Sequence, residues 1–318
     1  MTALHRTEWR AVGTTCAAAV TAGQEDEREV AWALAAAQEE VAACERELSR
    51  FDPTSDLSRL NDADGRWVYV GSRLLEALCL ALRAREETGG RFDPTVLPAL
   101  AAAGYDRSFE LLEERPAEEA NGWRAGTAVE LDERHGRARL EAGSAVDLGG
   151  IGKGYAAGRA LAAMRAAAPT AGGGLVDLGG DIAVSGESPE GGPWLIAVAD
   201  PRRVGETLAV LALEGGGVAT SGRNARRFGP ALSLHHLIDP ETGESALGGP
   251  LTVTVAAPDP VAAEVNATTL AIAGPGEAAD YVAARPHLSA LYVPHAGPAI
   301  PLGRLPLVTE RLVVRAAA

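Results

Sequence analysis

Six short segments with strand-like patterns follow one another between residues 174 and 256, and no helical pattern separates them. In chain order they are Gly174–Ser185, Trp194–Ala199, Thr207–Leu213, Gly217–Ser221, His235–Ile238 and Leu251–Ala256. Regular alternation of strands and helices would favour a parallel sheet, whereas a run of strands flanked by helices favours an antiparallel one. The sequence therefore predicts an α+β fold, with mixed or antiparallel sheets packed against helices.

The remaining segments are mainly helical. An apolar stripe runs from Val30 to Leu48 in alternating steps of four and three residues, which predicts a long amphipathic helix. The other expected elements are a first strand over Trp9–Thr21, a hairpin over Ala128–Glu141 and helices after Ser72, from Gly154 to Ala168, from Val261 to Ile272 and from Glu277 to Arg285. The prolines of Phe92–Pro98 argue against regular structure there. Since no flexible linker or internal repeat is visible, we expect one domain over residues 1–318, with a possible division into two lobes.

The protein is strongly acidic, with a formal net charge of −14. Such a field repels phosphate backbones, so we expect no nucleic acid partner, and an anionic ligand would need a cation within its own site. No apolar run is long enough to span a membrane. The segment from Arg6 to Ala22 has no leucine and lacks the apolar core of a signal peptide, so we expect a cytoplasmic protein.

The loop Asp147–Gly154 is rich in glycine and lies between a short strand and a helix. Successive glycines allow backbone N–H groups to approach an anion, and the helix N-terminus adds partial positive charge. Lys153 supplies a local cation. The loop matches neither a Walker motif nor a full GxGxxG motif. Taken alone, it fits a phosphate-binding loop and a tight structural turn equally well.

Glu264 and Thr268 are four residues apart on the helix that Asp259 and Pro260 are expected to open. This spacing places a carboxylate and a hydroxyl on one face, and both are oxygen donors that suit Mg²⁺. A solvated glutamate and a threonine bonded to its own helix explain the same pair.

Two adjacent histidines, His235 and His236, precede a turn. Strand alternation points them to opposite faces, so no more than one of them lines a given site. His236 is a candidate for a general base or a phosphate contact, although an ordinary surface histidine fits this position as well.

These signals form one ordered set, in which the chain resembles the ApbE-like FAD:protein FMN transferase family. The resemblance extends over nearly the whole chain, and the order and spacing of its blocks carry it. The blocks are Trp9–Thr14, Phe51–Asn61, Gly89–Thr95, Asp147–Tyr155, Asp177–Gly180, Trp194–Pro201, Ser221–Phe228, His236–Gly243, Ala263–Thr268 and Gly274. It implies an ApbE-like fold around a central cleft for a flavin nucleotide.

The resemblance also implies the residues of that cleft, with FAD as the substrate and Mg²⁺ on its diphosphate. Contacts to FAD are implied for Val12, Phe51, Arg91, Phe92, Asp93, Asp147, Lys153, Leu237 and Ile238. The metal would be held by a carbonyl of Gly150 or Gly152, by Glu264 and by Thr268, with Ala267 beside it. His236 and Lys153 would be catalytic.

The implied reaction transfers FMN from FAD to a threonine or serine hydroxyl of an acceptor protein and releases AMP. It requires the lysine-bearing loop and the helix of Glu264 to converge on one diphosphate. Two positions depart from the family: Glu264 stands where aspartate is usual, and Ala267 stands where some members place a second carboxylate. Two alternatives therefore stay open, an FAD pyrophosphatase that uses water as the acceptor and a flavin-binding protein with a degenerate metal site.

Overall fold

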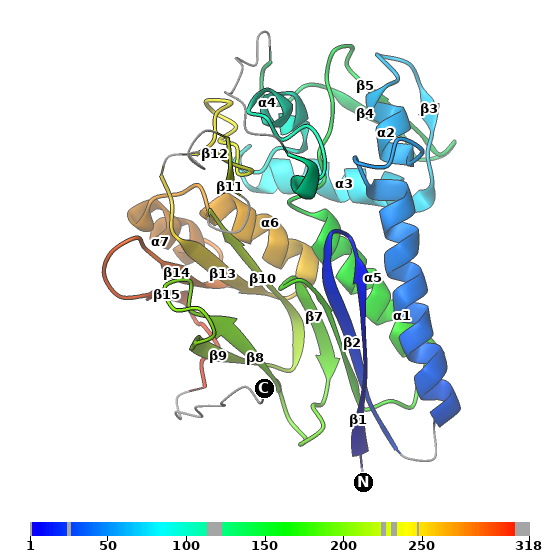
Figure 1. The fold of residues 1–318 in the computed structure, drawn as a ribbon, viewed down its shortest axis with the longest axis vertical. Helices are drawn as coiled ribbons and strands as arrows, with labels where there is room; N and C mark the ends of the chain where they lie inside the picture. The colour runs from blue at the N-terminus through cyan, green and yellow to red at the C-terminus, as the bar shows by residue number, and fades with distance from the viewer. Residues whose placement is uncertain are drawn as a thin grey trace.

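An eight-stranded antiparallel sheet forms the centre of the protein (Figure 1). The computed structural model describes residues 2–23, 27–112, 123–223, 227–229, 234–246 and 248–308. In spatial order the strands are β1 (Thr2–Ala11), β2 (Thr14–Gly23), β6 (Gly173–Leu178), β7 (Ile182–Gly186), β10 (Gly215–Gly222), β13 (Thr252–Ala257), β14 (Ser289–Val293) and β15 (Ile300–Gly303). Every neighbouring pair is antiparallel, which confirms the predicted α+β class.

Smaller sheets complete the β structure of the described residues. They are the sheet of β3 (Val68–Tyr69), β5 (Arg137–Leu140) and β4 (Val129–Asp132), the pair β8 (Trp194–Ala199) and β9 (Thr207–Leu213), and the pair β11 (Arg227–Phe228) and β12 (Leu234–His235). The β4–β5 pairing confirms the hairpin expected from the sequence. Strands β8 and β9 pack Trp194, Ile196 and Leu211 against Val184 and Val218, and so cover one face of the large sheet.

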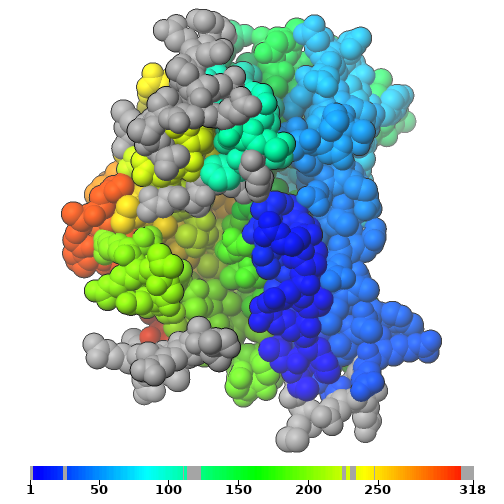
Figure 2. Space-filling model, viewed as in Figure 1, coloured from blue at the N-terminus to red at the C-terminus, as the bar shows by residue number. Residues whose placement is uncertain are grey.

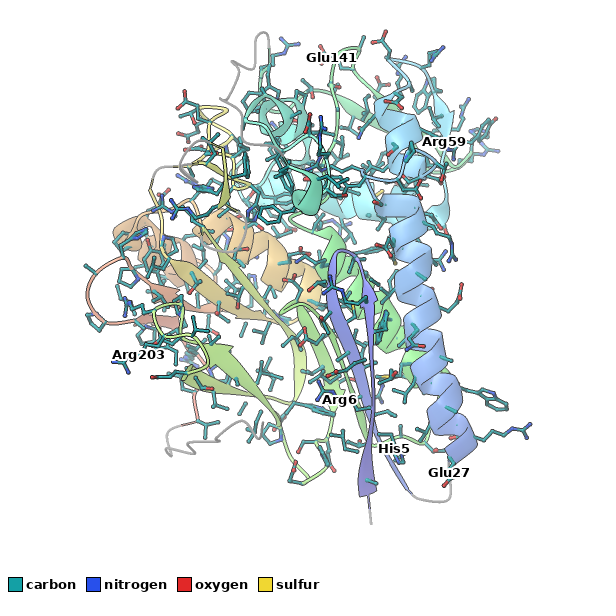
Figure 3. All side chains as sticks on the ribbon, in the orientation of Figure 1. His5, Arg6, Glu27, Arg59, Glu141 and Arg203 are labelled. Atoms are coloured by element: carbon teal, nitrogen blue, oxygen red, sulfur yellow. The ribbon has the colours of Figure 1, made fainter. Side chains whose placement is uncertain are left out.

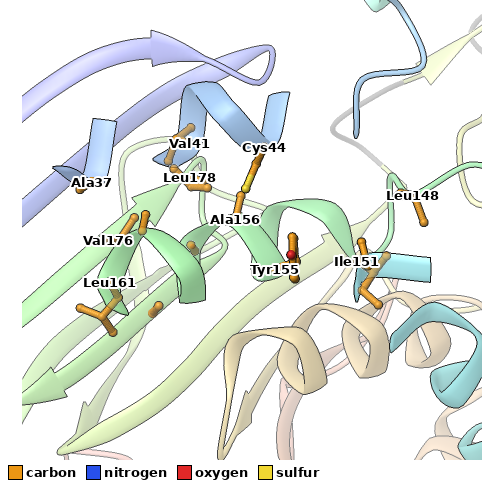
Figure 4. Packing of buried hydrophobic residues seen from close by; sticks show 14 of the residues in the cluster. Ala37, Val41, Cys44, Leu148, Ile151, Tyr155, Ala156, Leu161, Val176 and Leu178 are labelled. Carbon is orange, nitrogen blue, oxygen red and sulfur yellow. The ribbon is translucent and has the colours of Figure 1, made fainter. Parts of the chain in front are cut away.

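Helices cover the other face of the large sheet and one end of the molecule (Figure 1). They are α1 (Glu27–Leu48), α2 (Asp56–Asn61), α3 (Ser72–Glu87), α4 (Leu97–Ala102), α5 (Gly152–Ala167), α6 (Pro260–Leu270) and α7 (Pro275–Ala283), with short 3₁₀ turns at Pro94–Val96 and Phe109–Leu111. The predicted stripe of α1 is buried in the core. Figure 4 shows its Val41 and Cys44 beside Leu178 of β6 and Ala156 of α5.

The N-terminal strand prediction was wrong in one respect, because residues 2–23 form two strands joined by a tight turn. Ala11 pairs with Thr14, so only Val12 and Gly13 lie in the turn, with φ of 46° and 70°. Two residues with positive φ are typical of hairpin turns whose twist matches that of the strands. Small and polar residues occur both before and after the turn, so the sequence pattern does not change there. Figure 2 shows the hairpin at the front, with the segment around α4 above its turn.

The segment Phe92–Pro98 is also more regular than its prolines predict, since it contains a 3₁₀ turn and the start of α4. The prolines occupy the first or second position of each helix, where a missing N–H breaks no helical hydrogen bond. Asp93 caps the first of these helices by accepting the N–H of Thr95 at 2.8 Å. In the part of the chain that the structure describes, no helix is long and apolar enough to cross a membrane.

Candidate active site

A cleft with two adjoining chambers lies among the β1–β2 turn, the glycine loop, the β6–β7 turn and the segment that carries α4. The chambers measure about 220 and 530 Å³, and ligand pockets typically measure about 300–1,000 Å³. Both chambers are lined by Thr14, Arg50, Phe51, Tyr105, Asp147, Gly149, Lys153 and Gly179. Because the chambers share this wall, an elongated ligand can extend from one into the other.

The last residues of the glycine loop, Gly152–Gly154, form the first turn of α5, and this turn lies against α6. A Cβ on Gly154 would lie 2.3 Å from the carbonyl oxygen of Pro260, so only glycine permits this approach. A Cβ on Gly150 would lie 3.1 Å from Oγ1 of Thr268. The structure therefore brings together the lysine-bearing loop and the helix that carries the carboxylate and the hydroxyl.

Lys153 forms ion pairs with two buried carboxylates in the first chamber. Its Nζ lies 3.4 Å from Oε1 of Glu264 and also contacts Oδ2 of Asp181. The Glu264 and Asp181 side chains are only 3% and 5% exposed. Burial raises the pKa of the Glu264 carboxyl, whereas Lys153 and the N–H of Gly154, which donates to Oε2 at 2.7 Å, oppose this rise.

The ion pairs on the protein surface are different in kind. Arg6, Arg59 and Arg203, labelled in Figure 3, pair with nearby carboxylates while half or more of each arginine side chain stays exposed. Water and salt screen such pairs, which contribute little to stability. The two carboxylates that pair with Lys153 are almost fully buried, so their charge is expensive and has to be matched by a partner or a ligand.

Asp181 was not identified from the sequence. It follows the turn between β6 and β7, where Gly179 and Gly180 have φ of 74° and 97° and Oδ1 of Asp177 accepts the Gly180 N–H at 2.7 Å. The single strand expected over Gly174–Ser185 is thus a hairpin. A Gly-Gly pair between aspartates is a turn signal, but only the pairing of β6 with β2 and β7 places the turn beside Lys153.

Arg50 is a second residue that the sequence analysis missed. Its guanidinium lies over the rings of Phe51 and Tyr105, at 4.1 and 4.7 Å, and its Nε is 3.4 Å from Oδ1 of Asp147. The side chain is 7% exposed, and Nη2 is buried without a hydrogen-bond partner among the residues that the structure describes. A buried donor without a partner is unfavourable, so the arrangement fits a site that an anionic ligand completes.

The two adjacent histidines have different surroundings, as expected, although His236 lies beyond the end of the strand. His236 lines the first chamber. His235 is buried: its Nδ1 accepts the N–H of Leu237 at 3.3 Å and its Nε2 lies 2.8 Å from the carbonyl oxygen of Ala246. Burial lowers the pKa of His235, so this residue is neutral and structural. Strand β12 ends at His235, and the expected strand beyond it is reduced to an isolated bridge between Ile238 and Ser245.

The other residues implied by the resemblance occupy different places. The first chamber is lined by Arg91, Phe92, Asp93, Gly150, Leu237, Ile238 and Thr268, and the second by Val12 and Gly152. The fully buried Asp93 carboxylate pairs with Arg85 at 3.1 Å, so it shapes the wall. Ala267 lines neither chamber; it is buried in the apolar cluster of α6 and α7, and its carbonyl accepts the N–H of Ala271.

The donors around Lys153 fit a hard divalent cation. Glu264, Asp181 and Thr268 offer carboxylate and hydroxyl oxygens, which are the ligands that Mg²⁺ prefers in proteins. Oε1 of Glu264 is buried and accepts no hydrogen bond from the described part of the chain. Within the described residues no group of three or more His, Cys, Asp or Glu side chains is placed to hold a metal, so a cation here also needs hydroxyl, carbonyl or phosphate oxygens.

Comparison with known proteins identifies the family to which this cleft belongs. A family model described as the ApbE family matches residues 12–292, and this range includes both chambers, the glycine loop and α6. The chain belongs to the ApbE family. The relatives of this family member are transferases, and so is this enzyme.

Similar proteins cover most of the chain. A FAD:protein FMN transferase of Klebsiella pneumoniae is 30% identical over 267 residues, which are 81% of this chain and 75% of that protein. One of Treponema pallidum is also 30% identical, over 77% and 72% of the two chains. Among solved structures, the ApbE protein of Thermotoga maritima matches with a TM-score of 0.81 and 28% identity, over 94% of this chain and 97% of that one. The flavin transferase ApbE of Vibrio cholerae, at 20% identity and a TM-score of 0.78, covers 95% and 98% and supports the fold.

Proposed function

We propose that this family member is a magnesium-dependent FAD:protein FMN transferase. The observation that carries the proposal is the meeting of Lys153, Glu264 and Thr268 on the wall of a two-chambered cleft. Two adjoining chambers suit the two halves of a dinucleotide, and cations at their shared wall suit its diphosphate. The names of the relatives supply the identity of that dinucleotide and of the transferred group.

The charge of the cleft explains the need for a metal. Arg50 and Lys153 are the cations of the shared wall, and they already face the carboxylates of Asp147, Asp181 and Glu264. A diphosphate adds further negative charge, which two cations cannot balance. When bound, Mg²⁺ supplies the positive charge that phosphate oxygens require as the bond to the leaving group breaks.

The proposed reaction is an exchange of one P–O bond for another. The acceptor hydroxyl oxygen attacks the phosphorus on the FMN side, the bond from that phosphorus to the bridging oxygen breaks, and AMP leaves with the bridging oxygen. His236, in the first chamber, accepts the hydroxyl proton or orients the hydroxyl. Lys153 stabilises the charge that develops on the diphosphate.

Incubating the protein with FAD, Mg²⁺ and a threonine-containing acceptor peptide tests the proposal. We expect mass spectrometry to show the peptide with added FMN, together with an equal amount of AMP. Glu264→Gln and Thr268→Val should each lower the rate by roughly 10²–10³-fold, which is typical for the loss of one charge-stabilising group. Glu206→Gln, an exposed carboxylate, is the control and should keep the wild-type rate.

Two other outcomes would reject the proposal. AMP and free FMN without a modified peptide would show that water is the acceptor and that the protein is a pyrophosphatase. Bound FAD without any AMP would show a flavin-binding protein.

A further inference from the structure

Two carboxylates from distant parts of the chain reach the same ammonium group. Asp181 follows the β6–β7 turn, and Glu264 lies in the second turn of α6. Both side chains are at least nine-tenths buried, and both pair with Lys153, which is itself only 25% exposed. The cluster therefore combines two carboxylates with one ammonium, and the carboxylates are largely shielded from water.

One lysine does not complete this cluster. Oε2 of Glu264 accepts the N–H of Gly154 at 2.7 Å, but Oε1 accepts no hydrogen bond from the described residues and forms the ion pair with Nζ at 3.4 Å. A buried carboxylate oxygen without a hydrogen-bond partner is unfavourable. Glu264 lines the first chamber and has room on that side for a ligand, and two carboxylates that share one ammonium favour a cation as that ligand.

We propose that Asp181 and Glu264 form a carboxylate pair that binds a divalent cation, and that the Lys153 ammonium holds this place until the cation enters. A divalent cation neutralises both carboxylates at once, which the single ammonium cannot do. Thr268 lies one helical turn after Glu264 and offers a third oxygen. In this arrangement Asp181 supplies a second carboxylate, which position 267 does not.

The inference also gives Lys153 two successive roles. While the cation is absent, Lys153 balances the carboxylate pair. Once the cation is bound, the ammonium is released within the same cleft, where it is free to pair with a phosphate. Metal binding thus makes the Lys153 ammonium available to the diphosphate. The inference rests on the proposed function only for the identity of the nucleotide, because the carboxylate pair and the lysine are present without it.

Mn²⁺ binding to the nucleotide-free protein tests the proposal, since the EPR signal of free Mn²⁺ is lost on binding. Asp181→Asn removes one charge at nearly constant size and should weaken Mn²⁺ binding by at least about tenfold, the lower end of the effect of disturbing a metal site. Asp177→Asn is the matched control. It removes the same charge from the same turn, keeps an oxygen for the Gly180 N–H and does not line the cleft, so its affinity should equal that of the wild type.

Lys153→Met tests whether the ammonium holds the place of the cation, and here we expect tighter Mn²⁺ binding instead of weaker binding. Removing the competing ammonium should tighten Mn²⁺ binding by at least about tenfold, since a charge pair at this distance is worth more than that factor unless water screens it almost completely. Arg91→Met removes a positive charge from the same chamber, where Arg91 pairs with Glu277 instead of the carboxylate pair, and should leave the affinity unchanged.

Three results would overturn the inference. Wild-type affinity in Asp181→Asn would exclude Asp181 as a ligand. Unchanged or weaker binding in Lys153→Met, or equal tightening in Arg91→Met, would show that Lys153 does not hold the place of the cation. If circular dichroism shows that Asp181→Asn is unfolded, the comparison of Lys153→Met with Arg91→Met still tests the inference.

FMN transfer by the wild-type protein is measured in parallel, so that the two proposals can fail separately. Mn²⁺ affinities as predicted but no transfer would reject the proposed function and keep the carboxylate pair. FMN transfer by the wild-type protein, together with equal Mn²⁺ affinities for the wild type and Asp181→Asn, would reject the carboxylate pair and keep the proposed function.

Discussion

Gly154 is a point of close approach between α5 and α6, and its replacement by alanine tests the packing that assembles the cleft. The added Cβ would lie 2.3 Å from the carbonyl oxygen of Pro260 and 3.1 Å from Oε2 of Glu264, whereas ordinary contacts begin at 3.4 Å. A carboxylate can rotate away, but a backbone oxygen cannot. The two helices must therefore move apart.

The expected cost follows from three effects of different sign. Overpacking costs roughly 1–3 kcal/mol, and weakening the hydrogen bond from Gly154 to Glu264 costs about 1 kcal/mol more. Alanine in a helix interior regains about 1 kcal/mol relative to glycine. We expect Gly154→Ala to lower the free energy of unfolding by roughly 1–3 kcal/mol, and so to lower the Tm by about 2–10 °C.

Thermal unfolding followed by circular dichroism measures this loss, and Gly152→Ala is the matched control on the same helix. There the nearest atom to an added Cβ is Cβ of Leu148 at 3.9 Å, an ordinary contact, so the Tm should stay the same or rise. A Tm for Gly154→Ala at or above that of the wild type would refute the close approach of the helices. Equal losses of Tm in both variants would instead show that the cost comes from placing alanine in the first turn of α5.

Three further predictions concern the cleft. Arg50→Met should weaken FAD binding by about tenfold in a fluorescence titration, because it removes a buried charged donor from the shared wall; the exposed Arg203→Met is its control, and equal affinities would exclude Arg50 as a phosphate contact. His236→Asn should lower the rate of FMN transfer by roughly 10²–10⁴-fold and leave FAD binding intact. A matching loss of FAD binding would make His236 a binding residue instead. The pKa of His235 is lowered from its ordinary value of 6.5, so below that pH the unfolded chain binds a proton that the folded protein does not. The free energy of unfolding, measured with urea, should therefore fall as the pH drops from about 7.5 to 5.5, and it should fall less in His235→Gln. Equal falls in the wild type and the variant would contradict this cause.

Elements with a strong local pattern could be predicted from the sequence. The stripe of α1 repeats with the helical period along most of this 22-residue helix, and its apolar side faces the core. Asp259 and Pro260 open α6 as expected, with the Asp259 side chain accepting the N–H of Ala262. The first hairpin was missed because its turn at Val12 and Gly13 interrupts neither composition nor alternation. The N–H of Val12 is held by Oε1 of Glu45, a contact that no local pattern shows.

The candidate site could be predicted only in part. Lys153, Glu264 and Thr268 stand in motifs whose residue types and spacing suggest phosphate and metal chemistry, and a resemblance joined them into one site. Arg50 and Asp181 stand in no such motif. Arg50 follows the end of α1, and Asp181 follows a turn, so the local sequence predicts an ordinary charged surface residue at each position.

The sequence by itself determined most of the kinds of elements, the α+β class of the fold and most of the chemical groups available to the cleft, because these depend on residue type and on spacing within a segment. Only the tertiary structure decided which groups meet. The order of strands in the large sheet places the β6–β7 turn beside the glycine loop, and the missing side chain of Gly154 lets α6 approach α5. Contacts between residues far apart in the chain depend on this packing, and so two carboxylates share one lysine although no local pattern links them.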